Sequence, residues 1–342
     1  MRSWKLAPFI LAPFLMGSAC TDLFAPDPAA VVAPAEEALK EGNLPEAYAQ
    51  YDKAATDNAT MREAQIGAAY AYMLAGEYDK ADNTLSALEE GSEDVGDIKL
   101  RRAMVALAAG EYDSVKEHGV ASETAAGAVM AAEVHLADAE SDDALNLLKG
   151  AADEGGPVGR TATKYVEMLE SGDQFQAGLA EATALWALGD RESACDAAEE
   201  LVKGLETDDK GELLLLWAGR AVTSDRVEVA SGLLEEAEFA DIPPDHAWRV
   251  QATASMVQVA NGECATAQAT FTLLAEAGAP ADGLADARAT AAALTDDKEC
   301  AKALCEGLES AACARSLKEA GAGKAAKDQA PDGALSQFLE NN

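Results

Sequence analysis

A six-residue segment occurs three times in this chain at intervals of 34 residues. It reads Gly42-Asn-Leu-Pro-Glu-Ala, then Gly76-Glu-Tyr-Asp-Lys-Ala, then Gly110-Glu-Tyr-Asp-Ser-Val. Two equal periods with matching residue types indicate one structural unit that is copied along the chain. Such a chain is expected to fold as a stack of units, each packed on its neighbours, and not around a single central core.

Each copy has the pattern of two helices joined by a tight turn. The glycine is expected at the turn, because Gly adopts the left-handed conformation at little steric cost. A run of helical length without Pro precedes it, for example residues 63–75. A large residue follows the glycine after two positions and a small one after five; these are Leu44, Tyr78 and Tyr112, then Ala47, Ala81 and Val115. The small residues allow the second helix to pack closely on the first.

This pattern resembles the tetratricopeptide repeat (TPR), a helix–turn–helix unit of about 34 residues. On the TPR register, the small residue of the first helix is Ala35, Ala69 and Ala103 in the first three copies. Looser copies follow, with turn sites at residues 139, 189, 225, 262 and 296. The resemblance covers residues 29–310 and implies an all-α fold, a right-handed superhelical solenoid of about seven or eight repeats.

Composition agrees with a helical solenoid and bears on the choice of partner. Aromatic residues are 5% of the chain, and no sustained β-branched alternation predicts strands. The net charge of -35 repels phosphate backbones, so nucleic-acid binding is disfavoured. The acidic surface has two interpretations: it keeps an elongated protein soluble, or it recruits a basic partner.

The amino terminus has the features of an export signal. Residues 1–19 contain Arg2 and Lys5, an apolar run, and the small residues Gly17-Ser18-Ala19. With Cys20 these small residues resemble a bacterial lipobox, which implies lipidation of Cys20. Thr21 follows where Asp commonly signals inner-membrane retention, so the resemblance favours an outer-membrane anchor that faces the periplasm. The alternative is an ordinary signal peptide with a chance cysteine.

The rest of the chain divides into a tether, an array and a tail. We expect a lipid-anchored tether at 20–33, the solenoid at 34–320 and a flexible tail at 321–342. The spacing of 50 residues between the turn sites 139 and 189 leaves room for an extra segment at 150–173. It is expected to be a loop with a further helix over 161–169, and it is a possible break between two lobes. The tail has a second interpretation, as a capping or partner-binding segment.

Superposing the repeats places a mostly apolar ladder on the concave wall of the solenoid. Exposed apolar stripes usually mean contact with a partner, and large aromatics dominate binding energy. Trp186 is therefore the first choice for a central contact. The alternative is that these residues pack against the next repeat. The predicted partner-binding residues are Tyr70, Met73, Met104, Leu107, Leu136, Trp186, Val222 and Met256.

The cysteines suggest disulfides near the carboxyl end of the array. Cys264 and Cys300 lie one repeat apart, and Cys305 and Cys313 are close enough to join the last hairpin. Export would permit both bridges. Cys195 is then expected to be a buried free thiol. No CxxC spacing occurs and the three histidines are dispersed, so no metal or other cofactor is predicted.

We predict a binding protein, and no catalytic residue. No Gly-rich phosphate loop or GxSxG motif is present. The predicted function is an exported, lipid-anchored scaffold that binds a protein or peptide in the cell envelope and helps an envelope or secretion complex to assemble. The alternative is an enzyme or enzyme subunit acting on cell-wall polymer, since Glu170-Ser171 resembles the Glu-Ser start of lytic transglycosylases. The later Gly-Leu-Met-Gln stretch of that family is absent.

Overall fold

The computed structural model describes residues 27–40, 44–57, 61–92, 95–203, 210–237 and 242–308, together with Cys313 and Leu317. The predicted signal peptide, Cys20, the Gly42 turn and the tail at 321–342 lie outside the described residues.

In these ranges the chain forms seventeen α-helices, and no residue is assigned to a strand. The helices are α1 Pro28–Lys40, α2 Leu44–Asp57, α3 Arg62–Leu74, α4 Tyr78–Glu89, α5 Val95–Ala109, α6 Tyr112–Ala121, α7 Ala125–Ala137, α8 Ser141–Asp153, α9 Gly156–Glu170, α10 Gln174–Ala187, α11 Arg191–Lys203, α12 Lys210–Val222, α13 Val227–Ala237, α14 Ala247–Ala260, α15 Cys264–Glu276, α16 Ala281–Ala292 and α17 Lys298–Cys305. None of them is long and apolar enough to span a membrane.

The turns inside six of the hairpins share one backbone geometry. The turn residue has a positive φ at 76, 110, 139, 189, 225 and 262, six of the eight sites that the repeat register predicts. At Gly76 the chain makes a Schellman turn, in which the Glu77 amide donates to the Tyr72 carbonyl at 2.8 Å. The same bond recurs from Glu111 to Ala106 at 2.9 Å. The left-handed residue thus ends the first helix and turns the chain back into the second.

Eight hairpins and one extra helix account for the seventeen helices. The hairpins are α1/α2, α3/α4, α5/α6, α7/α8, α10/α11, α12/α13, α14/α15 and α16/α17, and α9 stands outside this pairing. The small residues of the register lie at the hairpin contacts, and Ala69, Ala81 and Ala103 are all buried. The fold is therefore a solenoid of TPR-like hairpins, as the sequence predicted.

Helix α9 is the segment that the 50-residue spacing predicted. It runs over Gly156–Glu170, longer at both ends than the expected helix at 161–169. It packs mainly on α8, while α10 packs on α7 and takes the place of the next first helix in the stack. Ala180 and Ala184 of α10 share one apolar cluster with residues of α7, α8 and α9. The core is thus continuous through this region, where the sequence had suggested a break between lobes.

The array begins where the repeat resemblance begins, and its first helix overlaps the predicted tether. Helix α1 starts at Pro28, inside the predicted tether at 20–33, and Val32 is buried in the first cluster. Proline suits a helix start, because its missing N–H would have no intrahelical partner there. The Asp27 carboxylate accepts from the Ala29 amide at 3.1 Å and caps the helix.

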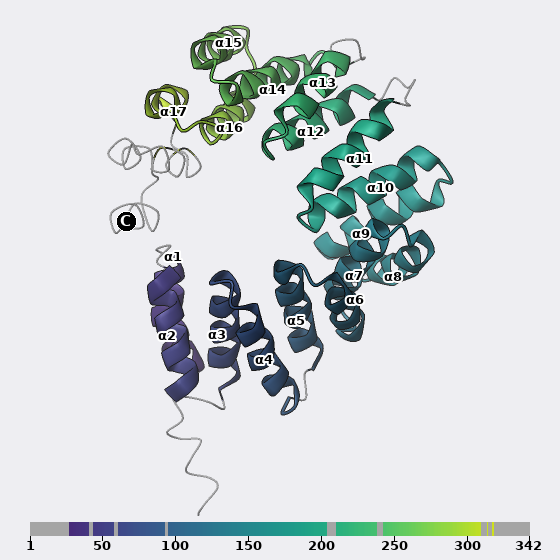
Figure 1. Ribbon diagram of the computed structural model, residues 1–342, viewed down its shortest axis with the longest axis vertical. Coiled ribbons are helices and arrows are strands. Elements are labelled where there is room, and N and C mark those ends of the chain that lie inside the picture. Colours follow the sequence, from purple (N-terminus) through teal and green to yellow (C-terminus); the bar gives the residue numbers. More distant parts are fainter. Residues whose placement is uncertain are drawn as a thin grey trace, which may run out of the picture.

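Figure 1 shows that the hairpins follow one another around a wide arc. The first helices α12, α14 and α16 line the inner side of the arc, and the second helices α13 and α15 lie outside (Figure 1). The arc curves so far that α17 comes round to face α1 and α2 across the opening (Figure 1).

Candidate functional site: an apolar groove on the early hairpins

Ladder residues of the second and third hairpins come together between α3 and α5. Tyr70 and Met104 occupy equivalent positions 34 residues apart, as do Met73 and Leu107. Tyr70 is 43% exposed and Met104 is 45% exposed. Leu74, one helical turn after Tyr70, is 40% exposed and lines a separate depression with Tyr48 of α2. Leu107 is partly buried and packs on a neighbouring cluster.

Tyr70, Met73 and Met104 line a shallow depression with a cavity volume of about 30 Å³. Its floor is formed by Leu85 of α4 and Val105 of α5, which are buried. Its walls are Ile66, Tyr70 and Met73 of α3 and Met104 of α5, with Arg101 at one side. We call this feature the α3–α5 groove. It stays open because α3 and α5 make little direct contact with each other.

Three predicted ladder residues are in the core, and the prediction of partner contact is corrected for them. Leu136, Val222 and Met256 are all buried. Leu136 lies in the cluster that α7 forms with α8, α9 and α10. Val222 and Met256 are covered because α12, α14 and α16 pack directly on one another. The apolar stripe is therefore accessible only near the beginning of the array.

Trp186 is a half-buried link between two hairpins. Its ring meets the buried Trp217 ring edge-on, with centroids 6.2 Å apart. The Arg220 guanidinium lies 4.9 Å from the Trp186 centroid and 4.5 Å from the Trp217 centroid. Burial lowers the pKa of Arg220, and among the described residues no carboxylate pairs with it. This stack joins α10 to α12, so the first expected effect of removing Trp186 is a loss of stability.

A second buried contact holds the extra helix. The Tyr165 hydroxyl of α9 donates to the Glu133 carboxylate of α7 at 3.1 Å. Burial raises the pKa of Glu133 to about 7, and the hydrogen bond from Tyr165 offsets only part of this shift. Burial and the adjacent Glu133 raise the pKa of Tyr165 as well. Glu133 thus resembles a neutral hydrogen-bonding group more than a surface carboxylate.

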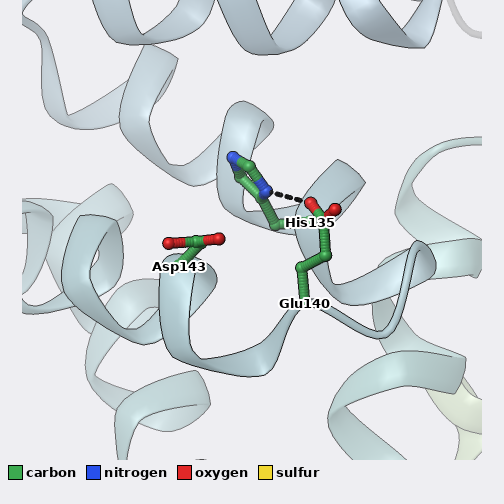
Figure 2. A group of neighbouring side chains, drawn as sticks. All are labelled: His135, Glu140 and Asp143. Atoms are coloured by element: carbon green, nitrogen blue, oxygen red, sulfur yellow. Dashed lines mark hydrogen bonds and ion pairs between the residues drawn. The ribbon is translucent and has the colours of Figure 1, made fainter.

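Three potential metal ligands converge beside the α7–α8 turn (Figure 2). His135 Nδ1 and Glu140 Oε2 are 2.6 Å apart, and Asp143 lies within the same cluster. The sequence did not predict this grouping, because the three residues straddle a turn without a metal-binding motif. The Lys116 ammonium lies 3.4 Å from Glu140 Oε2 and both carboxylates are exposed, so the arrangement has the character of a surface ion network.

The carboxyl end of the array contains two disulfides. Cys264 is bonded to Cys300, and Cys305 is bonded to Cys313. The first joins the start of α15 to α17. The second joins the last residue of α17 to Cys313, eight residues further along the chain. Cys195 is a buried free thiol, and burial raises its pKa. These pairings are the ones that the spacing of the cysteines suggested.

Glu170, the residue of the enzyme alternative, lies at the end of α9. Its carboxylate forms an ion pair with Lys149 at 2.7 Å, and about half of its side chain is exposed. A general acid usually lies in a cleft, within hydrogen-bond reach of the group that it protonates. Nothing in the surroundings of Glu170 favours such a role.

The hairpins, their left-handed turns and their 34-residue spacing define the class of this protein as a TPR-like α-solenoid. Solved structures that resemble it include a tetratricopeptide repeat protein from Parabacteroides merdae, which is 11% identical with a TM-score of 0.38 over 77% of this chain and 98% of that chain. The P58(IPK) TPR domain is 14% identical with a TM-score of 0.25 over 92% of this chain and 97% of that chain. No family model and no curated protein matches the chain.

Proposed function

We propose that this protein is an exported, lipid-anchored scaffold that binds a protein partner of the cell envelope through the α3–α5 groove. The observation that carries the proposal is the groove itself. Tyr70 and Met104 are two of the seven large apolar residues that are exposed in the described part of the chain, and both line the groove. A concentrated apolar patch beside polar surface is typical of an interaction site.

The groove suits an extended peptide or a short helix with apolar side chains. Its walls come from helices, and its methionines can adjust to different side-chain shapes. The polar group at its side is Arg101, which forms an ion pair with Asp97 at 3.2 Å. The partner would therefore insert apolar side chains and place polar groups toward this pair.

The sequence and the disulfides support the location that we propose for the protein in the cell. Residues 1–19 followed by Cys20 predict export and lipidation, and we propose an outer-membrane anchor that faces the periplasm. Two disulfides agree with an oxidising compartment. Replacing Cys20 by Ser should move the protein from the membrane fraction to the soluble periplasmic fraction. A chain that stays in the membrane fraction without Cys20 would contradict the lipid anchor.

The groove is tested by photo-crosslinking in cells. A benzophenone amino acid at position 70 or 104 should capture one major protein, which mass spectrometry then identifies. The matched control is position 273 on α15, since Leu273 is 63% exposed and lies outside the groove. If positions 70 and 104 capture the same proteins as position 273, the groove is not the binding site.

Assembly of an envelope or secretion complex is the role that we propose for this binding. A lipid anchor would hold the partner at the membrane while a multi-helix array supports it. If the captured partner is a component of such a complex, the substitution Met104→Asp should weaken its binding to the groove and lower the amount of assembled complex. Unchanged assembly in cells that carry Met104→Asp, with the protein present at normal level, would contradict this role.

A further inference from the structure

The α3–α5 groove is confined to one place in the array. Equivalent positions are covered in the later hairpins, where Leu136, Val222 and Met256 are buried. Helix α3 has 13 residues, so the groove is about 20 Å long at most. A short amphipathic helix of about two turns, roughly 11 Å long, matches this length. The occupant is therefore expected to present only a few large apolar side chains.

One segment of the chain itself has this pattern. Residues 318–342 lie outside the described residues, and their only large apolar residues are Leu335, Phe338 and Leu339. The spacing i, i+3 and i+4 would place all three on one face of a helix. The segment Ala334–Leu339 therefore has the pattern of a helix that binds in a groove.

The curvature of the array brings the start of this segment toward the amino-terminal hairpins that hold the groove. Figure 1 shows that α17 faces the α1–α2 end across the opening of the arc. Leu317 is buried in the core at the α17 end, so the chain leaves from there. Seventeen residues separate Leu317 from Leu335, and an extended chain of that length spans up to about 60 Å. A linked segment also has a high effective concentration at its site, commonly near mM for a short linker.

The charges at the groove agree with the same occupant. Arg101 lines the groove, and its side chain is 42% exposed although it pairs with Asp97. Glu340 directly follows the apolar triplet. A helix that inserts Leu335, Phe338 and Leu339 could direct Glu340 toward Arg101, which would fix its orientation.

We propose that the segment Ala334–Leu339 binds the α3–α5 groove of its own chain and competes there with the external partner. The competition rests on the proposed function, but the contact itself does not. Leu335, Phe338 and Leu339 would cover Tyr70, Met73 and Met104 until a partner displaces them. The groove is thereby shielded from non-specific association when no partner is present.

The test places the same benzophenone amino acid at position 338 of the purified full chain. Light should link position 338 to peptides of α3 or α5. Met104→Asp should abolish this crosslink, whereas Leu273→Asp should leave it intact, because both side chains are exposed but only Met104 lines the groove. Circular dichroism of both variants checks that the helices remain folded.

Isotope mixing separates the possible sources of the crosslink. In a mixture of light and heavy chains, contact within one chain links only peptides of equal isotope, while contact between two copies gives mixed pairs. Mixed pairs would overturn the proposal in favour of self-association. Crosslinks outside α3 and α5, or none, would overturn it as well.

The two proposals can fail separately. If position 338 does not reach the groove but positions 70 and 104 still capture a partner in cells, only the intrachain contact is wrong. If position 338 reaches the groove and no partner is captured even after residues 331–342 are deleted, the contact stands and the scaffold function fails. If both are correct, this deletion should increase capture from position 70 several-fold.

Discussion

At the scale of single residues, the left-handed turn position connects the sequence to the fold most directly. Gly76, Gly110, Gly189 and Gly262 adopt it without a steric penalty, but the turn before α8 places Ala139 at φ 60°. An L-residue in this conformation costs roughly 1–2 kcal/mol, so the Ala139 turn is strained where the Gly turns are not.

Ala139→Gly should therefore stabilise the protein. Relief of the strain, less the greater entropy of Gly in the unfolded chain, leaves a gain of about 0.5–1 kcal/mol. Chemical denaturation, followed by circular dichroism, measures the change. Gly110→Ala is the matched control, because a Cβ there would meet no atom within 4 Å and only the backbone is affected. It should lose about 1 kcal/mol, and a loss in Ala139→Gly would contradict the strain.

Glu133 predicts a pH dependence of stability. Its pKa is about 7 in the folded protein and near its ordinary value of 4.5 in the unfolded chain. Between these values the folded state binds more protons, so stability due to this group falls as pH rises through the window. The loss reaches about 3 kcal/mol above pH 7, from roughly 1.4 kcal/mol per unit of pKa difference.

Glu133→Gln should remove this dependence, because the amide is neutral and its oxygen still accepts from Tyr165. The gain in stability over the unchanged protein should be larger at pH 8 than at pH 5, as measured by denaturation at both values. Because the variant and the unchanged protein are compared at the same pH, the pH dependence that comes from the many surface carboxylates cancels. An equal difference at the two pH values would show that Glu133 is ionised in the fold.

At the scale of helices, local signals predicted the hairpins and could not predict their docking. The turn sites and the extra helix follow from residue types and spacing, which act within about one repeat. The burial of Leu136 depends on α9 and α10 closing on α7, and no pattern around Leu136 encodes that contact. The same holds for Trp186, whose half-buried position depends on Trp217 and Arg220 of the next hairpin.

The disulfide from Cys264 to Cys300 joins α17, in the last hairpin that the structure describes, to α15 of the hairpin before it. The bridge closes a segment of 36 residues, for which the chain-entropy model gives a stabilisation of about 3–4 kcal/mol. Replacing both cysteines by Ala should accelerate hydrogen exchange in α16 and α17. The helices α3 to α6 should be unaffected, because a solenoid transmits stability mainly between neighbours.

Cys195→Ala is the control for this experiment, since it also removes a buried sulfur but breaks no bridge. If α16 and α17 exchange equally fast in the protein with and without the bridge, the contacts of α14 with α16 already hold the end of the array.

At the scale of the whole molecule, repulsion between acidic residues at the two ends of the array opposes its curvature. The chain carries 61 acidic and 26 basic residues, and the arc brings both ends of this acidic array toward each other. Repulsion between exposed charges acts over about 30 Å at 0.01 M salt and about 8 Å at 0.15 M salt. Low salt should therefore favour a more open arc.

Small-angle X-ray scattering at these two salt concentrations tests this. The radius of gyration should decrease as salt increases, while helix content by circular dichroism stays constant. A neutral osmolyte such as sucrose is the control for changes in the solvent. A radius that does not change with salt would mean that contacts between hairpins fix the arc against its own charge.

The opening between α1 and α17 has a mechanical consequence. Each hairpin interface sets one small rotation, and these rotations add along the array. The width of the opening thus depends on the sum of the rotations at all the interfaces. A small change in the rotation at one interface therefore produces a large displacement at the ends of the array. Binding of a partner at α3 and reduction of the disulfide at α15 would then both change the width of this opening, although they occur at distant places in the array.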